Sequence, residues 1–245
     1  MGLLDGKAAV ITGAGSGMAR ATVEVFVREG AQVVAADISG AEKDTADSVG
    51  AGVIPVHCDV TNEADVEALM RTAVDAFGRV DVVCNVAGIA DAMMLADVTT
   101  EHYEKLMDVD LRGVLYGTKH AIRTMLESGN GGAIVNWSSL GGMNGSYFTS
   151  IYSAAKAGVI ALTKAAAIEY GGQGIRANCL CPGFIYTAMS AGGENIPGML
   201  EKAAQNRGGQ PEEVAEVAAF LASDRASYVS GAIVPIDGGW SAKLA

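Results

Sequence analysis

Hydrophobic and polar residues divide the chain into short, continuously apolar runs and longer segments in which apolar residues recur with a helical period. The apolar runs predict strands at residues 7–12, 32–37, 53–58, 80–85, 133–138, 176–181 and 232–236. The periodic segments predict helices at residues 18–29, 63–77, 100–126, 152–170 and 212–222. Strands that are apolar throughout are expected where helices cover both faces of a sheet. The alternation therefore predicts an α/β fold with a parallel, doubly wound sheet.

Composition indicates one globular domain spanning residues 1–245. Half of the residues are hydrophobic, and neither an internal repeat nor a low-complexity linker divides the chain. A net charge of −11 argues against nucleic acid or an anionic membrane as a partner. We find no apolar run long enough to span a bilayer, and the N-terminus lacks the pattern of a signal peptide. We therefore expect a cytoplasmic protein.

The cysteines and histidines do not form a metal-binding pattern. The cysteines lie in or beside apolar segments, and Cys179 and Cys181 are too close for a Cys-x-x-Cys motif. Buried, reduced thiols are the better interpretation. The histidines, His57, His102 and His120, are scattered along the chain. No metal site is predicted.

A glycine-rich turn follows the first predicted strand at residues 12–19, Thr-Gly-Ala-Gly-Ser-Gly-Met-Ala. Glycines in such a turn let the backbone approach a pyrophosphate, which then lies at the N-terminus of the next helix. The strict Gly-x-Gly-x-x-Gly pattern fails because the last position is Met18. Asp37 ends the second strand 20 residues after Gly17 (37 − 17 = 20). A carboxylate there favours a ribose hydroxyl over a 2′-phosphate, which predicts NAD rather than NADP.

Tyr152 and Lys156 are four residues apart in a predicted helix, so their side chains share one face. A phenol, with a pKa of about 10, is a poor base near neutral pH. A fixed ammonium beside it favours the phenolate, and the pair can then move a proton to or from an alcohol or carbonyl oxygen.

Taken together, these motifs resemble the compact, single-domain branch of the short-chain dehydrogenase/reductase family over nearly the whole chain. The resemblance implies a Rossmann-like sheet of seven strands in the order 3-2-1-4-5-6-7. It also implies a series of cofactor-binding residues: Gly13, Ser16, Gly17, Met18, Asp37, Asp59, Val60, Asn85, Ala87, Gly88, Tyr152, Lys156, Pro182, Gly183, Ile185 and Thr187. The segment 237–239, Asp-Gly-Gly, is similar to the family's signature after the last strand.

The resemblance implies a catalytic series of Ser139, Tyr152 and Lys156. Ser139 orients the substrate oxygen, Tyr152 exchanges a proton with it, and Lys156 favours the phenolate and holds the nicotinamide ribose. Ser138 is adjacent, but the spacing of 13 residues to Tyr152 (152 − 139 = 13) favours Ser139. Hydride then passes between the substrate carbon and the nicotinamide.

Two positions depart from the family pattern. Ala19 replaces the last glycine of the turn and adds one methyl group near the phosphates. Asp110 stands where the family usually has a catalytic Asn. A carboxylate near Lys156 offsets part of the positive field at Tyr152, so the hypothesis is an alkaline optimum for alcohol oxidation.

Two other motif matches are weaker. Residues 153–156 satisfy the Ser-x-x-Lys pattern of penicillin-binding proteins, but the chain lacks that family's Ser-Asp-Asn and Lys-Thr-Gly motifs. A Gly-x-Ser-x-Gly elbow is also absent from the sequence, which disfavours an α/β-hydrolase.

By the same resemblance, residues 188–209 form a lid over the substrate. The predicted substrate pocket is mostly apolar and comprises Met143, Tyr147, Phe184 and Met189. It suggests a secondary alcohol or ketone on an apolar or cyclic body, such as a hydroxysteroid, a cyclic alcohol or a 3-oxoacyl group. Helices near 100–126 and 152–170 resemble the family's dimer-forming pair, which implies a homodimer or homotetramer. The alternative function is an NAD-binding sensor with little turnover.

Overall fold

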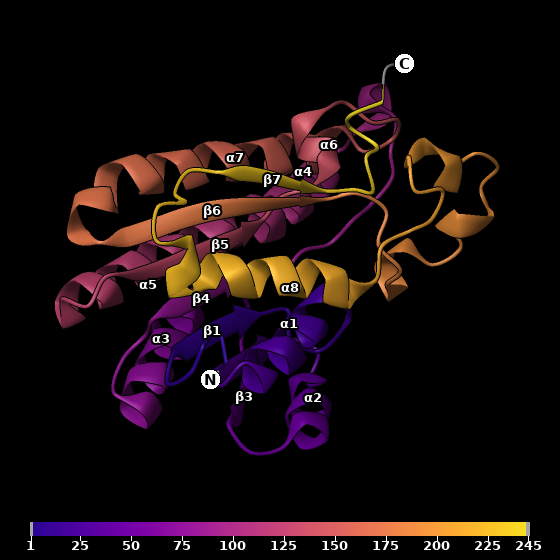
Figure 1. The fold of residues 1–245 in the computed structure, drawn as a ribbon. Coiled ribbons are helices and arrows are strands. Elements are labelled where there is room, and N and C mark those ends of the chain that lie inside the picture. The colour runs from indigo at the N-terminus through magenta and orange to yellow at the C-terminus, as the bar shows by residue number, and fades with distance from the viewer. Residues whose placement is uncertain (1, 244–245) are drawn as a thin grey trace.

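The computed structural model describes residues 2–243, and within them strands and helices alternate as the sequence predicts (Figure 1). The strands are β1 (Ala8–Thr12), β2 (Gln32–Asp37), β3 (Val53–His57), β4 (Val82–Asn85), β5 (Gly132–Trp137), β6 (Ile175–Pro182) and β7 (Ile233–Ile236). The α-helices are α1 (Gly17–Arg28), α2 (Glu42–Val49), α3 (Glu63–Phe77), α4 (Thr100–Met107), α5 (Gly113–Ser128), α6 (Leu140–Met143), α7 (Ser150–Tyr170) and α8 (Pro211–Ala222).

All strands of the seven-stranded sheet are parallel and lie in the order β3-β2-β1-β4-β5-β6-β7, which confirms the predicted topology. In the middle of the sheet, Val10 of β1 pairs with Val34 of β2 on one side and with Val83 of β4 on the other. After β3 the chain crosses back over β1 to enter β4. Such a switch in direction opens a crevice at the carboxyl ends of β1 and β4.

Helices cover both faces of the sheet, which explains why the strands are apolar throughout. Ile11 of β1 packs into a core with Phe26 of α1 and Leu221 of α8. Its neighbour Val10 points to the opposite face and packs with Leu69 of α3 and other buried residues. Figure 1 shows α1 and α8 together on one side of the sheet, and residues 188–209, the expected lid, beyond its carboxyl edge.

The structure differs from the predicted helices. The short helices α2 and α6 were not predicted, because α2 is mostly polar and α6 spans only four residues. The helix predicted at 100–126 consists of α4 and α5 joined by one π-helical turn, Asp108–Arg112, which inserts an extra residue into the helical period. Helix α7 begins at Ser150, so Tyr152 lies in its first turn.

Helix α7 also corrects the statement that no apolar run could span a bilayer. The segment Ser150–Gln173 meets that criterion by length and composition, with a mean hydropathy of 1.3. In the fold this helix packs against β6 and places Ala155, Lys156 and Val159 in the protein interior. Of the window that meets the criterion, 28% is buried within the chain.

Candidate active site

A cavity of about 350 Å³ lies at the carboxyl ends of β1, β2 and β4, at the predicted switch in strand order. Its lining comes from the loops after these strands and from the beginning of the lid. It gathers many of the predicted site residues: Gly13, Ser16, Gly17, Met18, Asp37, Asp59, Val60, Ala87, Gly88, Thr187 and Met189.

The glycine-rich turn brings the N-terminus of α1 to this cavity. Gly13 has φ of 74°, and a Cβ atom on it would lie 2.8 Å from Cα of Ala87, so a side chain does not fit. Ser16 is the N-cap of α1, yet its hydroxyl makes no capping bond within the described chain. The first N–H groups of α1 therefore remain available for an anion, as a dinucleotide pyrophosphate requires.

Asp37 is held at the rim of the cavity by backbone donors. Its carboxylate accepts hydrogen bonds from the N–H groups of Gly15 at 2.9 Å and Ser39 at 2.8 Å. Burial would raise the pKa of Asp37, but the hydrogen bonds from Ser39 and Gly15 outweigh it and lower the pKa. A charged carboxylate thus lies where the adenosine ribose of a dinucleotide is expected.

The buried side chain of Lys156 contacts a carboxylate, a backbone carbonyl oxygen and the ring of Tyr152. Its Nζ is 3.0 Å from Oδ1 of Asp110, donates to the carbonyl oxygen of Trp137 at 3.2 Å, and lies 5.7 Å from the ring centroid of Tyr152. Burial would lower the pKa of Lys156, but Asp110 and Tyr152 raise it above its ordinary value. The residue therefore places a permanent positive charge beside the Tyr152 ring.

Asp110 is completely buried and reaches Lys156 directly. Oδ1 also accepts from the N–H of Ile89 at 3.2 Å, whereas Oδ2 has no hydrogen-bond partner among residues 2–243. Burial raises the pKa of Asp110, and Lys156 only partly opposes that rise. Gly88 makes room for the pair, because a Cβ atom there would lie 2.7 Å from Asp110 Oδ1 and 3.2 Å from Lys156 Nζ.

The structure distinguishes the two candidate serines. Ser138 is buried, and its hydroxyl donates to the carbonyl oxygen of Lys156 at 2.7 Å. Ser139 is half-buried, and its Oγ accepts from the N–H of Gly141 at 3.0 Å, which leaves its own hydrogen to donate. A Cβ atom on Gly141 would lie 3.5 Å from Ser139 Oγ and 3.8 Å from a Tyr152 ring carbon, so both candidates border the same glycine.

The chain is similar to known proteins in its sequence and in its fold. A family profile described as "Enoyl-(Acyl carrier protein) reductase" matches residues 13–241. The 3beta-hydroxysteroid dehydrogenase 2 of Eggerthella lenta is 39% identical over 98% of this chain and 96% of its own length. The chain belongs to the short-chain dehydrogenase/reductase family. The meso-2,3-butanediol dehydrogenase of Serratia marcescens is also 39% identical, over 97% of this chain and 96% of its own.

The fold comparison agrees with this family membership. The crystal structure of a short-chain type dehydrogenase/reductase from Mycobacterium marinum superposes with a TM-score of 0.93 at 32% identity. The match covers 98% of this chain and 97% of that one. As these proteins are named dehydrogenases, the chain is an oxidoreductase of the short-chain dehydrogenase/reductase family.

Several residues that the family resemblance assigned to the cofactor do not line the cavity. Asn85 is buried and donates to Oδ1 of Asn136 at 2.8 Å, so its side chain stabilises the sheet interior. Pro182 and Gly183 end β6 beside Ile236 of β7. Ile185 borders a second cavity, described below, together with Phe184.

The predicted substrate residues are likewise divided. Met143, Tyr147 and Met189 are exposed, whereas Phe184 lines the second cavity. Further apolar side chains are exposed after the neighbouring strands β4, β5 and β6, and the sequence did not single them out: Met94, Leu95, Phe148 and Ile196. Ala19 lines the first cavity, near the expected phosphates, and so do residues that the sequence did not indicate as site residues: Ile38, Ser39, Cys58, Val86, Ile89, Val109 and Ala188. Most of these lie next to a predicted site residue in the sequence, which is the only signal that marks them.

The cysteines are free and buried, as expected. Burial, together with Asp65 and Asp59, raises the pKa of Cys58 to about 12, so this thiol stays protonated beside the cavity. Within residues 2–243 no cluster of His, Cys, Asp and Glu side chains could hold a metal ion.

Proposed function

We propose that the protein is an NAD-dependent dehydrogenase that interconverts a secondary alcohol and a ketone, with Tyr152 as general acid and base. The observation that carries this proposal is the buried ammonium of Lys156, 5.7 Å from the Tyr152 ring centroid, beside a cavity that begins at a helix N-terminus. This arrangement supports a proton-transfer group and a dinucleotide site at one edge of the sheet.

Each candidate residue has a separate task. During oxidation the Tyr152 oxygen would take the proton of the alcohol hydroxyl. Ser139 donates a hydrogen bond to the substrate oxygen. An ammonium has three donors, and Asp110 and the Trp137 carbonyl use two of those on Lys156, which leaves one for a ribose hydroxyl. Bound NAD supplies the hydride acceptor.

The expected substrate is uncharged and apolar. Met94, Met143, Phe148 and Met189 are exposed on loops after the neighbouring strands β4, β5 and β6. The two cationic side chains of residues 188–209 already have partners, since Lys202 lies over Trp240 and Arg207 pairs with Glu213. The related enzymes named for a hydroxysteroid and for butanediol support an alcohol of this kind.

NAD is the expected cofactor because Asp37 repels a 2′-phosphate. The test is nicotinamide absorbance against time with NAD and NADP separately, on a panel of steroids, cyclic alcohols and diols. Tyr152→Phe should lower turnover by about 10³-fold or more, whereas Asp37→Ser should improve the relative use of NADP. Tyr186→Phe is the matched control, because the Tyr186 hydroxyl accepts from Gly208 in the lid, away from the first cavity. Turnover retained in Tyr152→Phe would overturn the proposed mechanism.

A second candidate function is an NAD sensor with little turnover. The observation that favours it is the direct ion pair of Lys156 with Asp110, because the carboxylate offsets part of the positive field of Lys156 at Tyr152. NAD binding in calorimetry without turnover of any panel alcohol between pH 7 and pH 10 would support the sensor. Net formation of NADH would exclude it.

We also propose that the protein is a homodimer or homotetramer. Ile168 of α7 and Leu115 and Leu126 of α5 are exposed, and 28% of the most apolar window of α7 is buried within its own chain. Burial of such faces between subunits stabilises oligomers. Sedimentation equilibrium tests this, with Leu115→Asp expected to lower the oligomer mass. A monomer at micromolar concentration would contradict it.

A further inference from the structure

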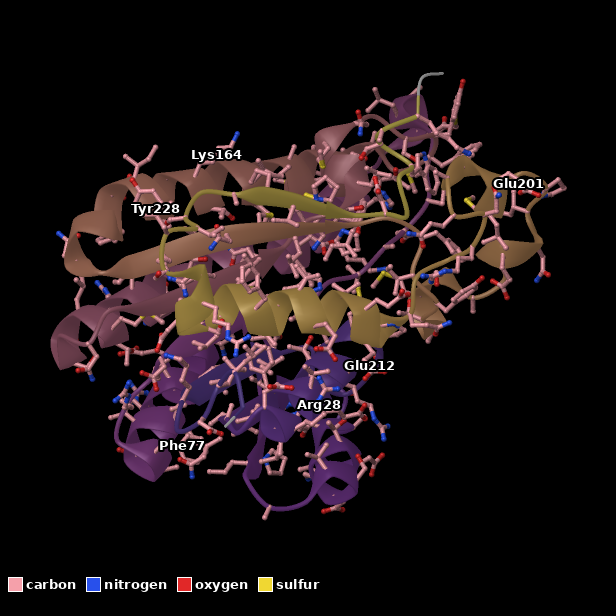
Figure 2. All side chains as sticks on the ribbon, viewed as in Figure 1. Arg28, Phe77, Lys164, Glu201, Glu212 and Tyr228 are labelled. Carbon is pink, nitrogen blue, oxygen red and sulfur yellow. The ribbon has the colours of Figure 1, made fainter. Side chains whose placement is uncertain are left out.

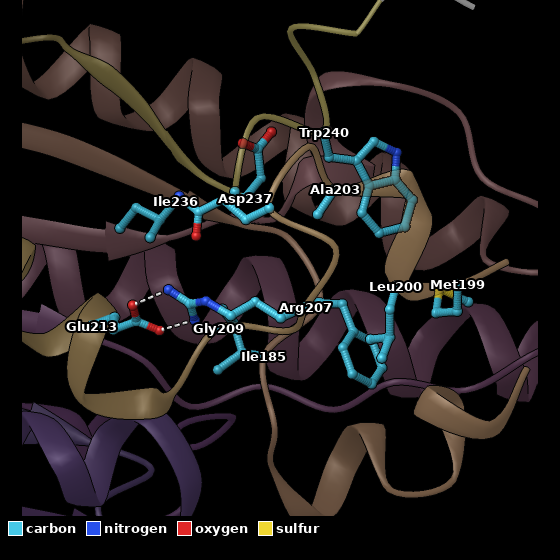
Figure 3. Close-up of a pocket in the computed structure, with 13 residues that line it drawn as sticks. Ile185, Met199, Leu200, Ala203, Arg207, Gly209, Glu213, Ile236, Asp237 and Trp240 are labelled. Atoms are coloured by element: carbon cyan, nitrogen blue, oxygen red, sulfur yellow. Dashed lines mark hydrogen bonds and ion pairs between the residues drawn. The ribbon is translucent and has the colours of Figure 1, made fainter.

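Backbone hydrogen bonds join the two ends of the lid, residues 188–209, where it meets the rest of the protein. The N–H of Tyr186 donates to the carbonyl oxygen of Gly209, and the N–H of Gly209 donates to that of Phe184, both at 2.9 Å. Arg207 also makes a two-point ion pair with Glu213 of α8 (Figure 3). The base of the lid is therefore fixed to the sheet edge and to a helix.

A second attachment joins the lid to the tail, which we define as residues 237–243. The N–H of Gln205 donates to the carbonyl oxygen of Gly238 at 3.1 Å. The ammonium of Lys243 donates to the carbonyl oxygens of Glu201 and Ala203. The backbones approach closely, since a Cβ atom on Gly239 would lie 3.0 Å from Cβ of Ala204.

Trp240 is the large side chain of this attachment. Its ring lines a cavity of about 110 Å³ together with the lid residues Met199, Leu200 and Ala203 (Figure 3). The ammonium of Lys202, also in the lid, lies 5.3 Å from the ring centroid, within the range of a cation–π interaction. Apolar contact and charge both hold this half of the lid against the ring.

Asp237 fixes the turn that presents Trp240. Its carboxylate accepts from the N–H groups of Gly239 at 2.9 Å and Ser241 at 2.8 Å. Its Cβ would lie 2.9 Å from a Cβ atom on Gly183, so the turn also rests on the end of β6. The turn that carries Trp240 is thus held by the end of the sheet as well as by the lid.

The other half of the lid, residues 188–198, contacts the segment after β6 and not the tail: the Ser190 hydroxyl donates to the carbonyl oxygen of Ile185, and a Cβ atom on Gly193 would lie 2.6 Å from a ring carbon of Phe184. It consists of short 3₁₀ turns separated by Gly192 and Gly198, both with positive φ, and it exposes Met189 (55%) and Ile196 (53%). Met189 lines the first cavity, beside the expected nicotinamide end.

We infer that Trp240 is a positioning residue for the substrate lid: it clamps residues 199–206 so that only residues 188–198 close over the alcohol. This inference rests on the proposed dehydrogenase function for its effect on substrate, but the clamp itself is independent of turnover.

The test compares Trp240→Ala with wild type by hydrogen–deuterium exchange and by kinetics. Amide exchange in residues 199–206 should become at least about 10-fold faster, because the clamp no longer opposes local opening. KM for the alcohol should rise about 5-fold with kcat within about 2-fold, since the lid contributes binding and not proton transfer. The Kd of NAD should remain within about 2-fold, because Trp240 does not line the first cavity.

Three variants make the result specific. Trp240→Phe keeps an aromatic face and should restore most of the protection. Tyr228→Ala removes another aromatic ring, at the end of the molecule far from the lid (Figure 2), and should change neither exchange nor KM. Lys202→Gln removes the cation over the Trp240 ring without opening a cavity. It replaces Trp240→Ala as the test of the clamp if that variant does not fold.

Unchanged exchange in residues 199–206 in both Trp240→Ala and Lys202→Gln would overturn the clamp. Faster exchange with unchanged KM would overturn the positioning role. Faster exchange in a protein that turns over no alcohol would instead refute the proposed function and leave the clamp supported.

Discussion

Two ion pairs lie at the carboxyl edge of the sheet, and they differ mainly in their exposure to solvent. Lys156 and Asp110 meet at 3.0 Å with side chains 4% and 0% exposed. Arg207 and Glu213 meet at 2.7 Å with side chains 48% and 44% exposed. Each pair joins two separate elements, α7 with the π-helical turn and the lid with α8.

The pKa shifts of the two acids have opposite directions. Burial raises the pKa of Asp110 despite the neighbouring ammonium, whereas the hydrogen bonds from Arg207 lower the pKa of Glu213 to about 2. Desolvation thus dominates in the first pair and pairing in the second. An ion pair between a carboxylate and a cation can therefore change the electrostatic field near Tyr152 where it is buried, whereas an exposed pair only holds a loop in place.

Removal of the cation from each pair gives the largest expected contrast. Lys156→Met leaves the Asp110 carboxylate buried without a counter-charge, so we expect a loss of about 3–5 kcal/mol in the free energy of unfolding. Arg207→Met leaves an exposed carboxylate in water and should lower Tm by only about 1–2 °C. Urea and thermal unfolding at pH 7 measure both.

The double variant Lys156→Met/Asp110→Leu is the control for this contrast. It replaces both charges with apolar groups and should recover most of the lost stability. Equal losses in Lys156→Met and Arg207→Met would show that burial does not separate the two pairs.

The buried pair should also set the pH dependence of turnover. Asp110→Asn removes a negative charge 3.0 Å from Lys156, which strengthens the positive field at Tyr152. We expect the midpoint of the rise in alcohol-oxidation rate with pH to fall, with a gain of about 10-fold at pH 7, equivalent to about 1.4 kcal/mol. Rate–pH profiles test this, with Glu213→Gln as the control whose profile should match wild type. An unchanged or higher midpoint in Asp110→Asn would refute the hypothesis.

The same contrast shows what the sequence could and could not predict. The parallel, doubly wound sheet, the glycine-rich turn and the shared face of Tyr152 and Lys156 follow from local patterns, whereas the strand order was implied by the family resemblance; the structure has this sheet in this order. The direct contact between Asp110 and Lys156 could be suspected only as a carboxylate near the lysine, because it depends on a π-helical turn that the apolar period does not reveal. The attachment of Trp240 to the lid joins segments whose contact depends on loop conformation. No periodic signal marks such contacts.

Glu42 offers a smaller test of how burial affects a carboxylate. It is fully buried at the start of α2, and neither carboxylate oxygen has a hydrogen-bond partner among residues 2–243. Glu42→Met removes these unpaired oxygens at similar length, so we expect stabilisation by about 1–2 kcal/mol.

The matched control for Glu42 is Glu212→Met in the first turn of α8. Glu212 is exposed and pairs with Arg28 (Figure 2), so its replacement should slightly lower Tm. Urea unfolding of both variants decides the matter. A loss of stability in Glu42→Met would contradict the expectation that the two unpaired carboxylate oxygens destabilise the fold.

The smallest expected effect concerns the exposed pair in acid. The pKa of Glu213 is about 2 in the folded protein and 4.5 as its ordinary value, so its stabilising contribution is complete above pH 4.5 and is lost as the pH falls towards 2. Because the pair is exposed, Glu213→Gln should lower Tm by only about 1–2 °C at pH 6. The difference between variant and wild type should narrow as the pH falls below 4.5. Thermal unfolding at 0.05 M and 0.5 M salt adds a second criterion, because salt screens exposed charges and should also reduce the difference. A difference that persists in acid and in high salt would mean that Glu213 holds the lid through its backbone bond to Gln210 rather than through Arg207.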